Sequence, residues 1–267
     1  MSESNKLTKK ERRAATREKM QALREQERKR AKRNRFIAVG TVALVLVISL
    51  VVIIKIVGAH KEENYTGTAR AAELQNVTAD YGIPFGKDGK ATAVQEGLPQ
   101  VGIYADYMCS HCTVLHHEAK EAYKEHENAG DVQLIQHPVA IMRTEFSELG
   151  AAAVFYVATY APDSFGDFND ALFAKSYDIM SEKSEPPSAE EIALIAAKAG
   201  VPKDVAADLP ASITSEAWKK VVAESNKVFS DHNYKGTPTV TVNGEEISGW
   251  SKVGMPEFLK QVAALKK

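Results

Sequence analysis

The residues best suited to chemistry in this chain are its two cysteines, which lie in one short motif, Cys109-Ser110-His111-Cys112. A disulfide between them would close a very small ring, so it would remove little entropy from the unfolded chain and add little stability. Two thiols at this spacing are better suited to exchanging electrons with other thiols. The motif therefore predicts a redox pair rather than a structural disulfide.

The sequence around the motif predicts a strand before it, at residues 100–106, and a helix after it, at residues 113–128. The N-terminus of a helix carries unpaired N–H groups and a partial positive charge, so it favours a thiolate. We therefore expect Cys109 to have a pKa below the ordinary value of about 8.5. Cys112, one turn further on, is expected to be more buried and to act as the resolving thiol. Asp106, three residues before Cys109, is expected to cap or pair locally, with proton transfer as the alternative.

Two other interpretations of the motif remain open. One is half of a zinc site, because His111, His116 and His117 are close in sequence. A zinc ribbon would need a second C-x-x-C, however, and adjacent histidines on a helix point about 100° apart. We therefore predict that His116 and His117 lie on a solvated helix face and that no metal or cofactor is bound. The other interpretation is a buried, inert cysteine pair.

The first 35 residues differ sharply in charge from the remainder. They hold 14 Lys or Arg and 5 Asp or Glu, whereas the remainder holds 20 basic and 30 acidic residues. A nucleic-acid-binding arm is one interpretation, because basic runs attract phosphate. The apolar segment that follows favours the other interpretation, a basic cytoplasmic tail with no nucleic-acid partner.

That segment, residues 36–54, is a run of 19 residues without charge. As a helix it would span roughly 29 Å, about the thickness of a bilayer core. It predicts a transmembrane anchor at residues 36–58, in contact with the lipid bilayer; a cleaved signal peptide is the alternative, but the run exceeds the usual length. The positive-inside rule then predicts a single-pass protein of the cell membrane, with residues 1–35 in the cytoplasm and the catalytic domain outside. The catalytic domain would then lie in an oxidising compartment.

Residues 59–90 are polar, with one short apolar cluster at residues 81–85, and predict a tether that joins the domain near its end. This tether is too short and too poor in apolar residues to hold a separate dimerisation domain. The domain itself is predicted at residues 91–267, with a first strand at residues 91–95.

Within that domain, strands at residues 100–106 and 131–137 flank the helix that Gly130 ends, so they should be parallel neighbours. A helical insertion follows at about residues 143–234. An Asn243-Gly244 turn then predicts a hairpin. The predicted helices of the insertion and of the C-terminus are at residues 147–160, 165–177, 188–199, 215–231 and 255–265.

Two motifs together resemble the DsbA-like thiol–disulfide oxidoreductases. Asp106-Tyr-Met-Cys-Ser-His-Cys112 is similar to the family's Asp-Tyr-x-Cys-Pro-x-Cys form, and Gly236-Thr-Pro-Thr-Val-Thr-Val-Asn-Gly244 is similar to its proline-loop signature. The resemblance covers about residues 85–267. It implies an α/β, thioredoxin-like fold with a helical insertion, here preceded by a single N-terminal transmembrane helix.

The same resemblance implies roles for the site residues. Pro238 would follow a cis peptide bond and pack beside Cys109 and Cys112, and Thr237 would offer backbone hydrogen bonds to an extended substrate. From the residues alone, a trans proline at the start of a strand is the alternative. Ser110, which stands where oxidising members usually carry proline, and His111 would tune the thiolate.

The function implied is donation of disulfides through Cys109 and Cys112 to exported proteins that carry free thiols. Reoxidation would come from a membrane quinone-linked enzyme. Because Ser110 departs from the family form, the direction of electron flow stays open, and a tethered reductase or isomerase on the same fold is the alternative. A third hypothesis is a non-catalytic metal- or peptide-binding module.

Overall fold

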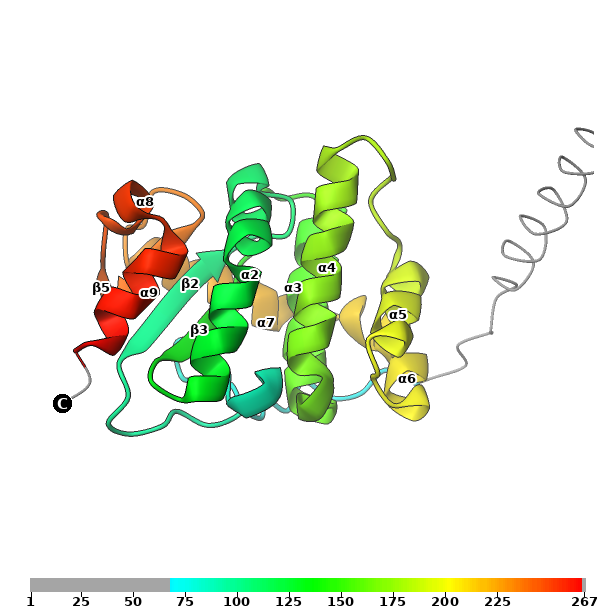
Figure 1. Cartoon of the computed structure of the whole chain (residues 1–267). Coiled ribbons are helices and arrows are strands. Elements are labelled where there is room, and N and C mark those ends of the chain that lie inside the picture. The colour runs from blue at the N-terminus through cyan, green and yellow to red at the C-terminus, as the bar shows by residue number, and fades with distance from the viewer. Residues whose placement is uncertain (1–67, 266–267) are drawn as a thin grey trace, which may run out of the picture. The chain divides into compact units, whose positions relative to one another are not determined.

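A five-stranded mixed sheet runs through residues 68–265, the part of the chain that the computed structural model describes (Figure 1). Its order is β1-β3-β2-β4-β5, and β2 and β3 are parallel while the other neighbouring pairs are antiparallel. The predicted parallel pairing around the helix is thus confirmed. The strands are β1 Ile83–Pro84, β2 Gln100–Ala105, β3 Gln133–Pro138, β4 Thr239–Val242 and β5 Glu245–Glu246.

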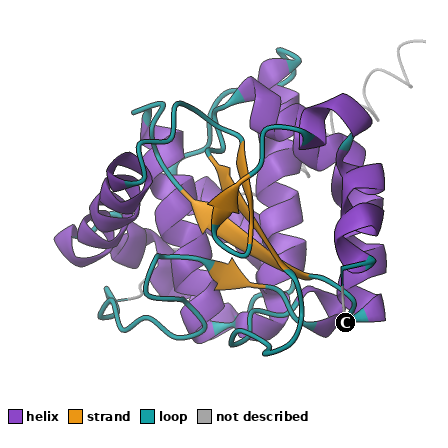
Figure 2. Ribbon diagram, turned by 90° about the vertical axis from the view of Figure 1, so that its left-hand side faces the viewer, coloured by secondary structure: helices purple, strands orange, loops and turns teal. Residues whose placement is uncertain are grey.

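Helices cover the sheet on both sides (Figure 2). Helix α2, Ser110–Ala129, and helix α9, Met255–Ala263, pack on one face, and α7, Glu216–Asp231, packs on the other. Strands β2 and β3 are buried almost throughout, because helices cover both faces of the sheet. The buried residues of β3 include the polar Gln133, Gln136 and His137. Helix α2 ends as predicted at Gly130, whose φ of 61° is the left-handed conformation that favours glycine.

The chain between β3 and β4 is helical, as the sequence predicts. Helix α3 lies at its centre, and every residue from Leu149 to Thr159 is buried. The alanine-rich sequence of α3 allows its neighbours to approach closely. Ser188 and Glu191 form the predicted capping box. The helices of this insertion are α3 Glu145–Tyr160, α4 Phe165–Met180, α5 Ala189–Lys198, α6 Lys203–Ile213 and α7.

The predicted start of the domain at residue 91 is wrong. The first strand is β1, within the predicted tether, and Ile83 is completely buried. Residues 91–95 form no strand; Ala91 makes a single bridge to Phe85. A two-residue strand is too short to show an alternating pattern, so polar residues around it gave the appearance of a tether.

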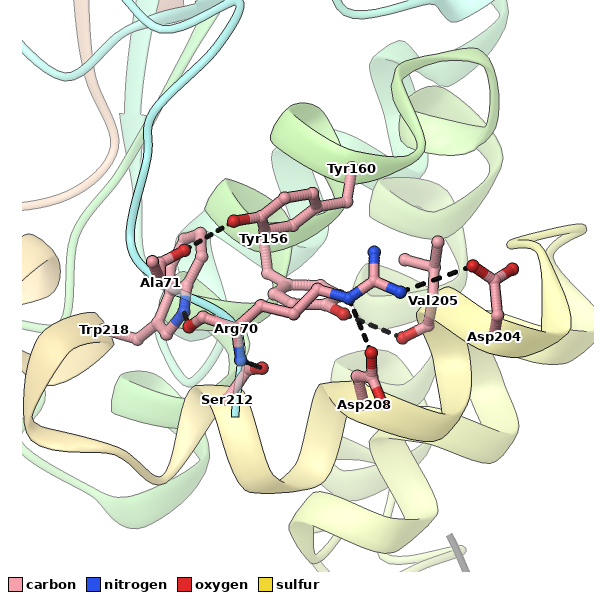
Figure 3. Close-up of polar contacts among 9 residues, drawn as sticks. All are labelled: Arg70, Ala71, Tyr156, Tyr160, Asp204, Val205, Asp208, Ser212 and Trp218. Atoms are coloured by element: carbon pink, nitrogen blue, oxygen red, sulfur yellow. Dashed lines mark hydrogen bonds and ion pairs between the residues drawn. The ribbon is translucent and has the colours of Figure 1, made fainter. Parts of the chain in front are cut away.

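An arginine near the start of the described chain joins this segment to the helical insertion (Figure 3). The backbone N–H of Arg70 donates to Ser212 Oγ at 2.8 Å, and its carbonyl accepts from Trp218 Nε1 at 3.0 Å. Its guanidinium donates to Asp208 at 2.6 Å and to Asp204 at 3.3 Å, and lies 5.2 Å from the centre of the Tyr160 ring. We call this set of contacts the Arg70 clamp.

The predicted tail at residues 1–35, the predicted anchor at residues 36–58 and the first part of the predicted tether lie outside the described residues. Between residues 68 and 265, no helix is both long and apolar enough to cross a membrane.

Candidate active site

The two cysteines lie where β2 ends and α2 begins. Cys109 is the N-cap residue of α2, and its N–H donates to the carbonyl of Asp106 at 3.0 Å. Cys112 lies in the first turn of the helix, and both are free thiols. Cys112 is 2% exposed and Cys109 6%, so the predicted order of burial is confirmed. Ser110 and His111, between them, are exposed.

The proline loop lies directly beside the pair. Strand β4 runs antiparallel to β2, with Thr239 opposite Tyr104, so the residues just before β4 reach the end of β2 from which the motif begins. The Thr237–Pro238 peptide bond is cis, as the resemblance implies. The Cys109 thiol donates to the carbonyl oxygen of Thr237 at 3.2 Å. The fold thus brings together two motifs that are 128 residues apart in sequence.

The surroundings of the two sulfurs separate their pKa values. A hydrogen bond from the Cys112 thiol, assisted by Thr237 and by the N–H groups of Cys112 and His111, lowers the pKa of Cys109 to about 5, although burial opposes the shift. Burial, together with the neighbouring Cys109, raises the pKa of Cys112 well above its ordinary value. At neutral pH the reduced pair therefore consists of a Cys109 thiolate and a Cys112 thiol.

A family model described as Thioredoxin matches residues 95–261, which is more than half of the chain. The chain belongs to the thioredoxin family. A comparison with curated protein sequences gives no match.

Solved structures place this thioredoxin-family chain among similar folds. It is similar to MdbA, a thiol-disulfide oxidoreductase from Actinomyces oris, with 26% identity and a TM-score of 0.62 over 73% of this chain and 89% of that one. BdbD from Bacillus subtilis, at 22% identity and a TM-score of 0.57, covers 74% of this chain and 100% of its own, and shows the same fold. DsbA from Mycobacterium tuberculosis has 20% identity and a TM-score of 0.51, over 70% and 99%. The predicted DsbA-like family, and thiol–disulfide oxidoreductase as its enzyme class, are confirmed.

Asp106 of this DsbA-like protein takes a larger part in the site than a local cap. Its side chain is fully buried and accepts hydrogen bonds from the N–H groups of Met108 and Met142 and from Ser147 Oγ. Two of these partners lie 36 and 41 residues away in sequence. The signal in the sequence was an acidic residue at the end of an otherwise apolar strand, directly before the motif.

The prediction that His116 lies on a solvated helix face is wrong. Its ring is buried, lies 2.8 Å from the Asp170 carboxylate and stacks on Phe173. His117 is exposed and stacks on Tyr177. Among residues 68–265, no group of three or more His, Cys, Asp or Glu has the geometry of a metal site.

A cavity of about 170 Å³ lies behind α2, between that helix, β3 and α4. No residue of the cysteine motif lines it, so it is separate from the active site. Glu127 lines the cavity, and burial, with the charge of Asp170, raises the pKa of its carboxyl to about 7 although Lys124 opposes the shift.

We expect Glu127→Gln to stabilise the protein at pH 8. Between pH 4.5, the ordinary pKa, and about 7 the folded state holds a proton that the unfolded state has lost, so stability falls as pH rises through this window. At about 1.4 kcal/mol per pH unit across this window, the loss that the variant avoids is on the order of 3–4 kcal/mol. Urea unfolding at pH 4.5 and pH 8 measures it.

Glu125→Gln, at an exposed position of the same helix, is the matched control and should change stability little at either pH. A Glu127→Gln variant with the same stability difference from wild type at pH 4.5 and pH 8 would contradict the prediction.

Proposed function

We propose that the protein donates disulfide bonds to exported proteins that carry free thiols. The observation that carries this proposal is the position of Cys109 as the N-cap of α2, where the Cys112 thiol and the N–H groups of His111 and Cys112 stabilise its thiolate. A thiol of low pKa is a good leaving group, so a disulfide that contains it is readily attacked and reduced. This favours an oxidant over a reductant.

The reaction begins with the Cys109–Cys112 disulfide. A substrate thiolate attacks the Cys109 sulfur, the bond to Cys112 breaks, and Cys112 takes a proton because its pKa is high. A second substrate thiolate then attacks the substrate sulfur of the mixed disulfide. Cys109 leaves as a thiolate, two electrons have passed from the substrate to the protein, and the substrate holds a new disulfide.

The proline loop would receive the substrate chain. Thr237 and Pro238 are partly exposed and lie beside Cys109, which is the position needed to hold a peptide next to the attacked sulfur. The backbone of Thr237 would form hydrogen bonds with the main chain of an extended substrate, as in the addition of a strand to a sheet. Because these bonds involve only the substrate backbone, many substrate sequences would be accepted. Ser110 and His111, exposed within the motif, would tune the thiolate and face the incoming chain.

We place this reaction outside the cytoplasm, with the chain held to the membrane through residues 36–58 and the basic residues 1–35 inside the cell. The support is the uncharged run of 19 residues that follows a tail rich in Lys and Arg. Reoxidation of the cysteine pair would fall to a membrane quinone-linked enzyme. Protease treatment of intact cells should digest the catalytic domain and spare a tag on residue 1; the reverse pattern would overturn this topology.

The reduction potential of the full-length protein, measured against a glutathione buffer series, tests the direction of electron flow. We expect a value near the DsbA figure of about −120 mV, together with rapid oxidation of a reduced two-cysteine peptide. A value near the thioredoxin figure of about −270 mV would overturn donation and support the tethered reductase. Faster reshuffling of a scrambled substrate than oxidation of a reduced one would instead support an isomerase.

A further inference from the structure

The buried carboxylate of Asp106 is not used in the exchange steps described above. It follows β2 directly and precedes Cys109 by three residues, and its side chain is 0% exposed. In the part of the chain that the structure describes, no Lys, Arg or His lies within ion-pair distance of it. A buried carboxylate without a basic partner is costly, so its hydrogen bonds must offset much of that cost.

Those hydrogen bonds come from three directions. Oδ1 accepts from the N–H of Met108 at 2.8 Å and from Ser147 Oγ at 2.7 Å, and Oδ2 accepts from the N–H of Met142 at 2.8 Å. Met108 belongs to the motif, whereas Met142 lies in the loop after β3 and Ser147 in the first turn of α3. Asp106 therefore joins the cysteine motif to the start of the helical insertion.

Both oxygens of the Asp106 side chain act as acceptors in this set of bonds. Each of its two oxygens faces a backbone N–H, so both must accept. An asparagine would turn its NH₂ group toward one of the two donors, whereas a carboxyl group presents an oxygen to each. Burial raises the pKa of Asp106, and the bonds from Met142, Met108 and Ser147 oppose that shift.

The same segment determines where the Cys109 sulfur lies. The carbonyl of Asp106 accepts the N–H of Cys109 at 3.0 Å, and the Cys109 carbonyl accepts the N–H of Thr113, so residue 109 is held at both ends as the N-cap of α2. In this position its sulfur meets the N–H groups of His111 and Cys112. A small displacement of the segment would weaken those bonds.

We propose that Asp106 is a positioning residue for thiol–disulfide exchange: its carboxyl group holds residues 106–109 against the loop before α3, which places the Cys109 sulfur where the first N–H groups of α2 stabilise its thiolate. The inference rests on the proposed role of Cys109. A purely electrostatic role would have the opposite sign, because a carboxylate near a thiolate repels it and its removal would favour the thiolate.

The test is the pKa of Cys109 in the reduced full-length protein, followed by thiolate absorbance at 240 nm, in Asp106→Asn and Asp106→Ala. We expect both variants to raise this pKa, by about one unit, as lost hydrogen bonds to a thiolate do. The equilibrium constant with glutathione should move about tenfold toward the weaker oxidant. An unchanged or lowered pKa in Asp106→Asn would overturn the proposal.

Two further variants separate positioning from a general loss of stability. Ser147→Ala removes one of the three hydrogen bonds to Asp106 and keeps the acid, so it should raise the pKa of Cys109 by a smaller amount. If Asp106→Ala fails to fold, an unchanged pKa of Cys109 in Ser147→Ala would overturn the proposal. Thr159→Val removes the buried acceptor of the Gln75 N–H, at the other end of α3 from Ser147, and should leave the pKa of Cys109 unchanged. A wild-type pKa near the ordinary value would count against the proposed function, whereas a wild-type value near 5 with unchanged variants would count against Asp106 alone.

Discussion

Cys109→Ser should abolish the oxidation of dithiol substrates, with a loss on the order of a thousandfold or more. The variant keeps a side chain of similar shape at the N-cap of α2 but has no sulfur that a substrate thiolate could attack. The rate of oxidation of a reduced two-cysteine peptide measures the loss. Ser230→Ala, an exposed position on α7, is the control and should retain the full rate.

Cys112→Ser should behave differently, because it retains the attacked sulfur and loses the resolving one. Incubated with a substrate that carries a disulfide, its Cys109 thiolate should attack one substrate sulfur and release the other as a thiolate. The mixed disulfide should then accumulate because no Cys112 thiol releases the substrate, and it is visible by mass spectrometry and by electrophoresis without reductant. The difference follows from burial: Cys112 is nearly inaccessible, whereas Cys109 lies beside the partly exposed proline loop. If Cys109→Ser accumulated mixed disulfides and Cys112→Ser did not, the roles of the two cysteines would be reversed.

The reduction potential should depend on pH with a change of slope at about pH 5. Above that pH the reduced pair holds one proton, on Cys112, so two electrons and one proton are taken up and the potential falls by about 30 mV per pH unit. Below it, Cys109 is also protonated and the slope doubles to about 59 mV per unit. A glutathione buffer series from pH 4 to pH 8 measures both slopes.

The same titration predicts how pH affects the stability of the reduced protein. Cys109 in the unfolded chain stays protonated up to its ordinary pKa of about 8.5, whereas in the folded protein it is ionised above about 5. Stability from this group therefore rises with pH between these values, by about 1.4 kcal/mol per unit, and is lost as pH falls to 5. Cys109→Ser should remove this pH dependence of stability. In the redox titration, a reduction potential that falls by about 59 mV per pH unit from pH 5 to pH 8 would show that Cys109 stays protonated, contrary to both predictions.

Local features of this protein were predictable from its sequence, and distant contacts were not. The motif, the elements on either side of it and the Asn243-Gly244 turn depend on neighbouring residues, and the structure confirms them. The buried pairing of His116 depends on Asp170, 54 residues away, and no local pattern indicates it.

In the active site, too, the contacts between residues distant in sequence were not predictable. The cis bond before Pro238 came from the resemblance rather than from any physical property of the residues. The role of Asp106 depends on Met142 and Ser147, which only the packing of α3 against the motif brings near. β1 was missed because a two-residue strand has no period of its own.

The Arg70 clamp has a mechanical consequence. The described chain enters the domain beside α6, and its first strong contacts are with α3, α6 and α7 (Figure 3). A pull on the chain from its N-terminal side is therefore borne first by these helices, through bonds to both the backbone and the side chain of one residue. The cysteine motif and the proline loop carry none of these contacts. In a protein tethered to a membrane through its N-terminal segment, the Arg70 clamp would take up force from that segment. Motion of the segment would then leave the geometry around Cys109 undisturbed.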